Sequence, residues 1–317
     1  MKTRLPAYLC LAAAMAIAGS SVVVGRILTL QLPVFLTSAA SLFMALLVLA
    51  PLTWRTHRGL PGIPKGDLKV LFLQALTGIV LFRVFLLYGL RMTSATAGGI
   101  ITSTMPAVVG LIAFLFLKEK PAWNKVGGIA LSVAGVLAVN TVGLSADTAR
   151  YGSLWGNLLV FWAVVGEALF TILQKKISKG SSALTRTALV SLFAFLSFLP
   201  FAVYEGLCFD FTSVRWSDGL CIAYYGVVVT AVAFILFYKG AAAVPASTAG
   251  VFAGFMPVSS VLLSNLILGE RLMPCHLLGL GFVVAGIALM AASAGSEPRP
   301  ADGEHRPVSP SRQPSVF

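Results

Sequence analysis

Charge is scarce in this sequence. Only 11% of the 317 residues are Asp, Glu, Lys or Arg, whereas 58% are hydrophobic and the mean hydropathy is +0.91. Soluble domains carry about 25% charged residues and about 45–50% apolar ones. Too few polar groups remain to cover the surface of a water-soluble globule of this size. We therefore predict a membrane protein, with the lipid bilayer as its main partner.

The residue types that build metal sites and active sites are also scarce. The chain has three histidines and four cysteines, at no spacing typical of metal ligands, and it has no glycine-rich phosphate loop. The histidines, which fall in predicted loops and the tail, are His57, His276 and His305. We therefore expect no enzyme, no cofactor and no metal. Cys208 and Cys221 flank a predicted outer loop, where they either form a disulfide or stay free.

The net charge is +12, but its distribution does not suit nucleic acid. A nucleic-acid surface needs a contiguous basic face, whereas the basic residues here form short clusters between apolar runs. About 20 apolar residues cross the hydrocarbon of a bilayer as a helix, and we predict ten such spans. They are Pro6–Gly25, Pro33–Trp54, Val70–Leu90, Thr93–Leu117, Val126–Val142, Leu154–Gln174, Leu184–Tyr204, Leu220–Tyr238, Ala243–Leu268 and Leu277–Ala294.

The basic residues also set the orientation of the spans. Cytoplasmic loops carry an excess of Lys and Arg. If the N-terminus is cytoplasmic, the predicted outer segments hold only Arg26, Arg91, Arg150, Arg215 and Arg271, and most other Lys and Arg residues fall on the inner side. We therefore predict that both termini are cytoplasmic. The tail 296–317, rich in Pro, Ser and charge, is predicted to be disordered.

The two halves of the chain match each other. Met105-Pro106 matches Met256-Pro257, and Glu119 matches Glu270 at the same displacement; near the start of each half, Ser20 falls on Glu167. We therefore predict two five-helix repeats, 1–145 and 146–295. Because five is odd, the repeats have opposite orientations in the membrane. Inverted repeats are typical of transporters that work by alternating access around a site near the midplane.

Several motifs, in this order and spacing, carry a family resemblance. They are GSSVVVGR (Gly19–Arg26), LYGLRMTSATAG (Leu87–Gly98), Met105-Pro106 followed by LKEK, ASTAGVFAGFMP (Ala246–Pro257), LGER (Leu268–Arg271) and GLGFVVAGIAL (Gly279–Leu289). Together they resemble the EamA-like family of the drug/metabolite transporter superfamily. The resemblance implies ten helices, a central cavity surrounded by helices 1–4 and 6–9, peripheral helices 5 and 10, and secondary transport, often export, of amino acids, related metabolites or drugs.

Two positions depart from the family pattern. The second span of the family usually carries an arginine near its outer third, where this chain has FLTSAASLFMA around Ser41. Conversely, Arg83 lies within the third span. An unpaired arginine at this depth is costly, so we expect a partner. It is Glu167 or the carboxylate of a substrate, and a purely structural role is the alternative.

Glu167 is the central candidate of the second half. Thr171 and Gln174 follow at i+4 and i+7, so the three residues share a helix face. Acids within membrane spans cost several kcal/mol and usually have a function. We interpret Glu167 as a proton carrier or cation-binding carboxylate. The alternative is a buried polar tie between helices.

The remaining candidates are less specific. Trp162 is predicted to line the cavity, together with Ser20. Pro106 and Pro257 are predicted to kink or hinge their spans. Four tyrosines near span ends are predicted to lie in the interfacial belt: Tyr88, Tyr224, Tyr225 and Tyr238. Glu119 and Glu270 are expected to cap helices or pair with neighbouring basic residues, without a role in transport.

These observations favour a multi-pass secondary transporter of a bacterial cytoplasmic (inner) membrane, as a monomer or homodimer. We expect it to export a small amphipathic metabolite, with proton antiport as the preferred coupling. Uptake, or facilitated diffusion without protons, is the alternative within transport. A membrane receptor or assembly protein that transports nothing is the alternative of another class.

Overall fold

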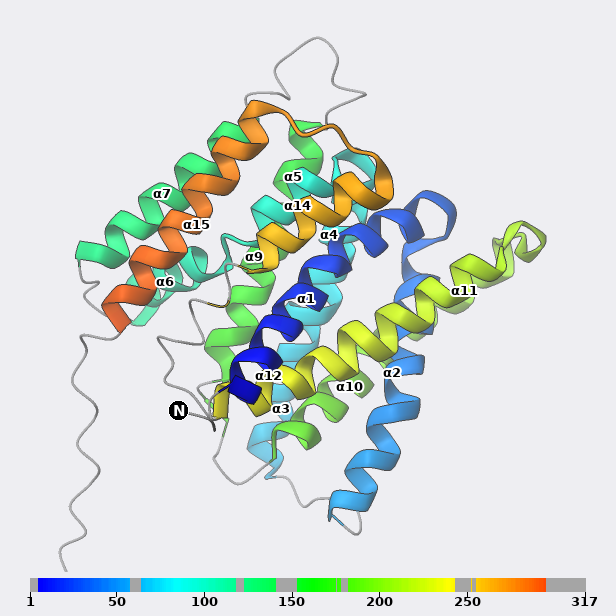
Figure 1. The fold of residues 1–317 in the computed structure, drawn as a ribbon. Helices are drawn as coiled ribbons and strands as arrows, with labels where there is room; N and C mark the ends of the chain where they lie inside the picture. Colours follow the sequence, from blue (N-terminus) through cyan, green and yellow to red (C-terminus); the bar gives the residue numbers. More distant parts are fainter. Residues whose placement is uncertain are drawn as a thin grey trace, which may run out of the picture.

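The computed structural model describes residues 5–57, 64–117, 123–140, 153–174, 176–177, 182–242, 252 and 255–294. Every regular element within these ranges is helical (Figure 1). This is the expected result for a membrane chain, because a helix pairs its backbone groups within one segment and leaves few exposed to hydrocarbon. The predicted tail 296–317 lies outside the described residues.

The helices follow the predicted spans in order. The first half contains α1 (Leu5–Gln31), α2 (Val34–His57), α3 (Lys65–Ala75), η1 (Leu76–Leu81), α4 (Phe82–Met92), α5 (Ala95–Thr102), α6 (Met105–Leu117) and α7 (Trp123–Asn140). The second half contains α9 (Leu154–Gln174), α10 (Ala183–Cys208), η3 (Phe211–Ser213), α11 (Trp216–Ala223), η4 (Tyr224–Val232), α12 (Ala233–Ala242), α14 (Phe255–Leu268) and α15 (Pro274–Ala294).

Seven of the described helical segments are long and apolar enough to cross a membrane, and three shorter apolar helices accompany them. The shorter ones are Val126–Ala138, Phe255–Leu268 and Pro274–Leu289. The multi-pass, all-helical class predicted from the sequence is confirmed. The count of ten spans, the inverted repeats and the placement of the termini stay predictions.

Three predicted spans are not continuous α-helices. The third span changes from α3 to the π-helix η1 and back to α4, and the eighth changes from α11 to the π-helix η4 and then α12. The fourth is interrupted at Ser103 and Thr104, between α5 and α6. These irregular stretches lie next to the polar residues described below.

The structure describes the chain directly before Pro106 but not all of that before Pro257. Pro106 is the second residue of α6, directly after the interruption at Ser103 and Thr104, so the span does not pass through it as one continuous α-helix. Pro257 is the third described residue of α14, and because residues 253 and 254 lie outside the described residues, its predicted kink stays a prediction. A proline fits the first turn because the missing N–H has no partner there in any helix. A hinge role for these residues stays a prediction.

Helices α7 and α15, the fifth and tenth predicted spans, pack side by side at one edge of the molecule (Figure 1). Their backbones meet at glycines. A Cβ added to Gly286 would lie 2.7 Å from the carbonyl oxygen of Gly128 and 2.9 Å from Ser132 Oγ. Small residues permit such close approach. In membranes, helices associate through van der Waals packing, because lipid leaves no hydrophobic driving force between them.

This contact predicts opposite effects for two alanine substitutions in α15. Gly286→Ala should lower the melting temperature by several degrees, because overpacking a tight contact costs about 1–3 kcal/mol. Gly281→Ala is the matched control, since no atom of another described helix lies within 4 Å of its Cβ position. It should leave stability unchanged or raise it, because alanine is the better helix former by about 1 kcal/mol. Thermal unfolding of the purified protein in detergent measures both, and equal shifts would contradict the tight α7–α15 contact.

Candidate functional site

The centre of the site is the guanidinium of Arg83, the second residue of α4, whose side chain is only 5% exposed. Its Nη1 donates to Ser41 Oγ at 2.6 Å and, more weakly, to the carbonyl of Ser38 at 3.4 Å, both on α2. Its Nη2 donates to Thr230 Oγ1 on η4 at 3.1 Å. The guanidinium also lies 4.9 Å from the centre of the Tyr225 ring. Arg83 therefore joins α2 and α4 of the first half to η4 of the second.

The π-helical geometry of η4 brings two of these contacts together. Thr230 Oγ1 accepts from Arg83 and donates to the carbonyl of Tyr225, five residues earlier, at 3.0 Å. Five residues is the hydrogen-bond spacing of a π-helix, a rare conformation that is frequent at functional sites. Tyr225 is 5% exposed and contacts a buried cation, so its predicted place in the interfacial belt is wrong.

Helix α1 also contacts η4, through a hydrogen bond between Ser20 and Tyr224, the residue before Tyr225. Ser20, predicted as a site residue, is buried and donates to the carbonyl of Ile17 at 2.6 Å. Its hydroxyl oxygen lies 2.7 Å from the hydroxyl of Tyr224. Because the Ser20 proton is used by Ile17, the geometry favours Tyr224 as the donor. Ser20 and Tyr224 thus tie α1 to the start of η4, one residue from the ring that covers Arg83.

Glu167 lies on α9 and is half-buried. Its backbone carbonyl accepts from Thr171 Oγ1 at 3.1 Å, which places these two predicted residues together. The charges of Glu167 and Arg83 both act on the phenol of Tyr225, so the three groups share one polar region. The expected ion pair is absent, however: among the described residues, the hydrogen-bond partners of Arg83 are on α2 and η4, and Glu167 is not one of them.

Two predicted site residues of α9 are placed elsewhere or not described. Trp162 is 52% exposed and shares an outward-facing stripe with Trp155 and Leu158. It therefore faces the surroundings of the protein and does not line the polar region. The sequence could not distinguish the two placements, because the lipid-facing side of a span accepts large apolar rings as readily as a cavity does. Gln174 is the last residue of α9, and its side chain lies outside the described residues.

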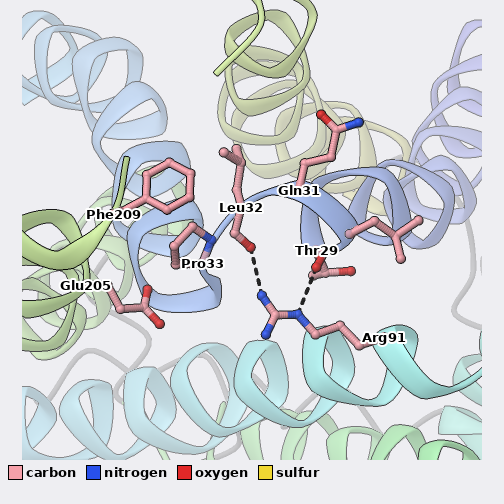
Figure 2. Close-up of a pocket in the computed structure, with 8 residues that line it drawn as sticks. Thr29, Gln31, Leu32, Pro33, Arg91, Glu205 and Phe209 are labelled. Atoms are coloured by element: carbon pink, nitrogen blue, oxygen red, sulfur yellow. Dashed lines mark hydrogen bonds between the residues drawn. The ribbon is translucent and has the colours of Figure 1, made fainter. Parts of the chain in front are cut away.

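A separate, shallow pocket of about 540 Å³ opens at the end of the bundle predicted to face outward (Figure 2). Its charged groups are Arg91 and Glu205. Arg91 donates from Nε to the carbonyl of Thr29 and from Nη2 to that of Leu32, each at 2.8 Å. Glu205 Oε2 accepts from the backbone N–H of Leu36 at 2.8 Å. Both charges therefore fix the turn between α1 and α2, and we read this pocket as structural.

The same end of the bundle, predicted to face outward, also holds two cysteines whose pairing the sequence left open. Cys208 and Cys221 are both free thiols in the structure. Between them, Asp210 Oδ1 accepts from the backbone N–H of Thr212 at 2.9 Å and from its hydroxyl at 2.7 Å. These hydrogen bonds lower the pKa of the Asp210 carboxyl, which lies outside the spans. The loop is thus closed by local polar contacts.

Comparisons with known proteins agree with the membrane class. A model of the EamA-like transporter family matches residues 5–141 and 154–292. An uncharacterized transporter of Bacillus subtilis, YetK, is 43% identical over 287 residues, covering 90% of this chain and 87% of the relative. A chloroplastic WAT1-related protein of Arabidopsis thaliana is 25% identical, covering 83% of this chain and 64% of the relative. One crystal structure shares the fold, with a TM-score of 0.59 and 17% identity over 92% of this chain and 98% of the other.

The Arg83 contacts predict a large loss from a small change. Ser41→Ala removes the shortest hydrogen bond to the guanidinium and should destabilise the protein by about 1–3 kcal/mol, the usual cost of leaving a buried polar group unpaired. The matched control is Ser197→Ala, because Ser197 is half-buried and, among the described residues, its hydroxyl bonds to its own helix, at the carbonyl of Phe193. Thermal unfolding compares the two, and equal melting temperatures would contradict a structural role for the Ser41 contact.

Proposed function

Because the chain belongs to the EamA-like transporter family, and is thus a membrane transporter and not an enzyme, we propose that it exports a small amphipathic metabolite by alternating access. Amino acids and related compounds are the first candidates, and the bacterial cytoplasmic membrane is the proposed location. The single observation that carries the proposal is the buried Arg83, ringed by hydroxyl groups and an aromatic face. The ten-span architecture of two inverted five-helix repeats, as a monomer or homodimer, belongs to the same proposal.

The surroundings of Arg83 support an anion as part of the substrate. A buried cation without an opposite charge is costly, and within the described residues its polar contacts are two hydroxyls and a carbonyl. Ser38 Oγ, on the same stretch of α2, is buried and has no hydrogen-bond partner in the described part of the chain. A carboxylate could accept from both the guanidinium fork and this hydroxyl, an arrangement that arginine favours.

Glu167 supplies the complementary charge for an amphipathic substrate. Glu167 is half-buried, shares the polar region of Tyr225 and, within the described residues, does not pair with Arg83. A carboxylate in this setting can hold a proton or a substrate ammonium group, and a residue that holds the two alternately couples their movements in opposite directions. We therefore propose proton antiport with Glu167 as the carrier. Uptake, or facilitated diffusion without protons, would use the same residues and differs only in coupling and direction.

The proton-carrier role predicts the behaviour of Glu167→Gln in proteoliposomes. Glutamine keeps the shape and the hydrogen-bonding capacity but binds no proton in this pH range. We expect the variant to lose exchange driven by a pH gradient while keeping the melting temperature of the parent protein. Counterflow measured with and without a pH gradient separates coupled from uncoupled transport.

The matched control for this test is Glu205→Gln, the same change at another half-buried helical glutamate. It removes the charge of a carboxylate that accepts from the start of α2 and that is not among the described partners of Arg83. Exchange driven by a pH gradient should survive it. Normal pH-driven exchange in Glu167→Gln would eliminate the carrier role and leave Glu167 as a polar tie between helices.

The anion-anchor role predicts a ligand effect that depends on Arg83. A ligand that binds the folded protein stabilises it by mass action and so raises its melting temperature. At a ligand concentration of 100 times Kd, the stabilisation is about 2.7 kcal/mol. Within a panel of amino acids and related metabolites, we expect a stabilising ligand whose effect disappears in Arg83→Gln. Its carboxamide analogue, which lacks the anion, should stabilise neither protein. Equal stabilisation of both proteins by the acid would contradict the anchor.

A further inference from the structure

Glu270 makes an unusual contact at the end of the bundle predicted to face outward. It lies in the turn between α14 and α15, and its carboxylate reaches the first turn of α5. Oε1 accepts from the backbone N–H of Ala95 at 2.8 Å, and Oε2 accepts from the backbone N–H of Thr96 at 2.8 Å and from its hydroxyl at 2.7 Å. Glu270 thus caps a helix, as expected, but the expectation that its partners are local is wrong, because α5 belongs to the other half of the chain.

The turn is built to hold this carboxylate in place. Gly269 has φ = 64°, a left-handed conformation that glycine adopts without strain. Its N–H bonds to the carbonyl of Asn265 at 3.1 Å, and the side-chain amide of Asn265 donates to the carbonyl of Glu270 at 2.9 Å. The acceptor is ionised and faces the positive end of a helix, so these bonds belong to the strong class.

The segment held by Glu270 is the most enclosed helix among those described. Every residue of α5 is buried, and it packs against α9, α14 and α1. At Gly99, an added Cβ would overlap the side chain of Ser260 on α14, so the two helices pack closely there because position 99 has no side chain. One end of α5 is fixed by Glu270, and the other ends at the interruption formed by Ser103 and Thr104.

A short rigid helix, fixed at its outer end and interrupted at its inner end, can tilt about the interruption once the outer end is released. We propose that Glu270 is a positioning residue of the transport cycle. Its hydrogen bonds hold α5 against the α14–α15 turn while the outer end of the bundle is closed, and they must break before that end can open. This inference rests on the proposed alternating-access function. In this proposal, Glu270 lies at the end of the bundle predicted to face outward and controls access to the polar region without touching the substrate.

Nearby contacts close the same end. The guanidinium of Arg26, on α1, donates to the carbonyl of Leu90, at the end of α4, and its charge interacts with that of Glu270. Thr93 and Asn157 then join the chain before α5 to the start of α9 through their side chains. The contact made by Glu270 thus belongs to a layer of polar contacts that crosses from one half of the chain to the other.

The test measures access from outside and needs no substrate. Ser103→Cys is introduced after replacing the four native cysteines by serine: Cys10, Cys208, Cys221 and Cys275. Intact cells are treated with a maleimide that does not cross membranes. With Glu270→Gln, we expect Cys labelling at position 103 about tenfold faster, because losing hydrogen bonds to an ionised acceptor shifts a two-state equilibrium by that order.

The matched control is Asp210→Asn, which removes one negative charge from the same predicted side of the membrane. Among the described residues, the hydrogen bonds of the Asp210 side chain are to Thr212, two residues away. The labelling rate of this variant should equal that of the parent. Equal labelling of Glu270→Gln and the parent would overturn the proposal, since a purely structural cap could lower stability without changing access from outside.

A second variant keeps the proposal testable if Glu270→Gln does not fold. Thr96→Val removes only the hydroxyl contact and leaves both backbone contacts to Glu270, so we expect a labelling increase of about two- to fivefold, as suits a single hydrogen bond. An unchanged rate in this folded variant would overturn the proposal equally. Because labelling is measured without substrate or proton gradient, it is independent of whether Glu167 and Arg83 perform the transport proposed above.

Discussion

A buried positive charge in a chain surrounded by hydrocarbon constrains everything near it. Desolvating an arginine costs several kcal/mol even after relaxation, so the groups that surround it must be polar or aromatic ones that stabilise its charge. Arg83 obtains them from Ser41 and the Ser38 carbonyl on α2, and from Thr230 and the Tyr225 ring on η4. These elements come from both halves of the chain, so the charge at the centre also determines which helices must meet there.

The same constraint explains where the backbone is irregular. In a bilayer, departures from the α-helix are tolerated only where protein or a cavity satisfies the freed groups. The π-helix η1 ends directly before α4 and Arg83, and η4 carries both Tyr225 and Thr230. The third interruption, at Ser103 and Thr104, is buried, and its side chains bond to the carbonyls of Gly99 and Ile101. Polar side chains and irregular backbone thus support each other in the interior.

Hydropathy predicts most of this fold, because the bilayer requires long apolar helices wherever the chain crosses it. It also singles out Arg83 and Glu167, since a charge within an apolar run is conspicuous. It could not find Tyr225 and Thr230 as partners: at about 100° per residue they lie about 140° apart on an α-helix, and only the π-helix aligns them. Nor could it place Trp162, because apolar residues face lipid and cavity alike. Nor could it tell that Arg83 and Glu167 do not pair among the described residues, because a contact between them depends on helix rotation, which composition does not encode.

The placement of the Arg83 partners links charge to movement. Ser38, Ser41 and Arg83 belong to the first half of the chain, whereas Tyr225, Thr230 and Glu167 belong to the second. If the two halves move relative to each other, the bonds from Arg83 to α2 can persist, but those to η4 must lengthen or change. A cation that loses a partner in a low-dielectric interior becomes a better anion site, so each conformation offers a substrate a different affinity. That difference is the condition for a ligand to shift a conformational equilibrium at all, and in the proposed alternating-access cycle it would arise from a single guanidinium shared between two halves.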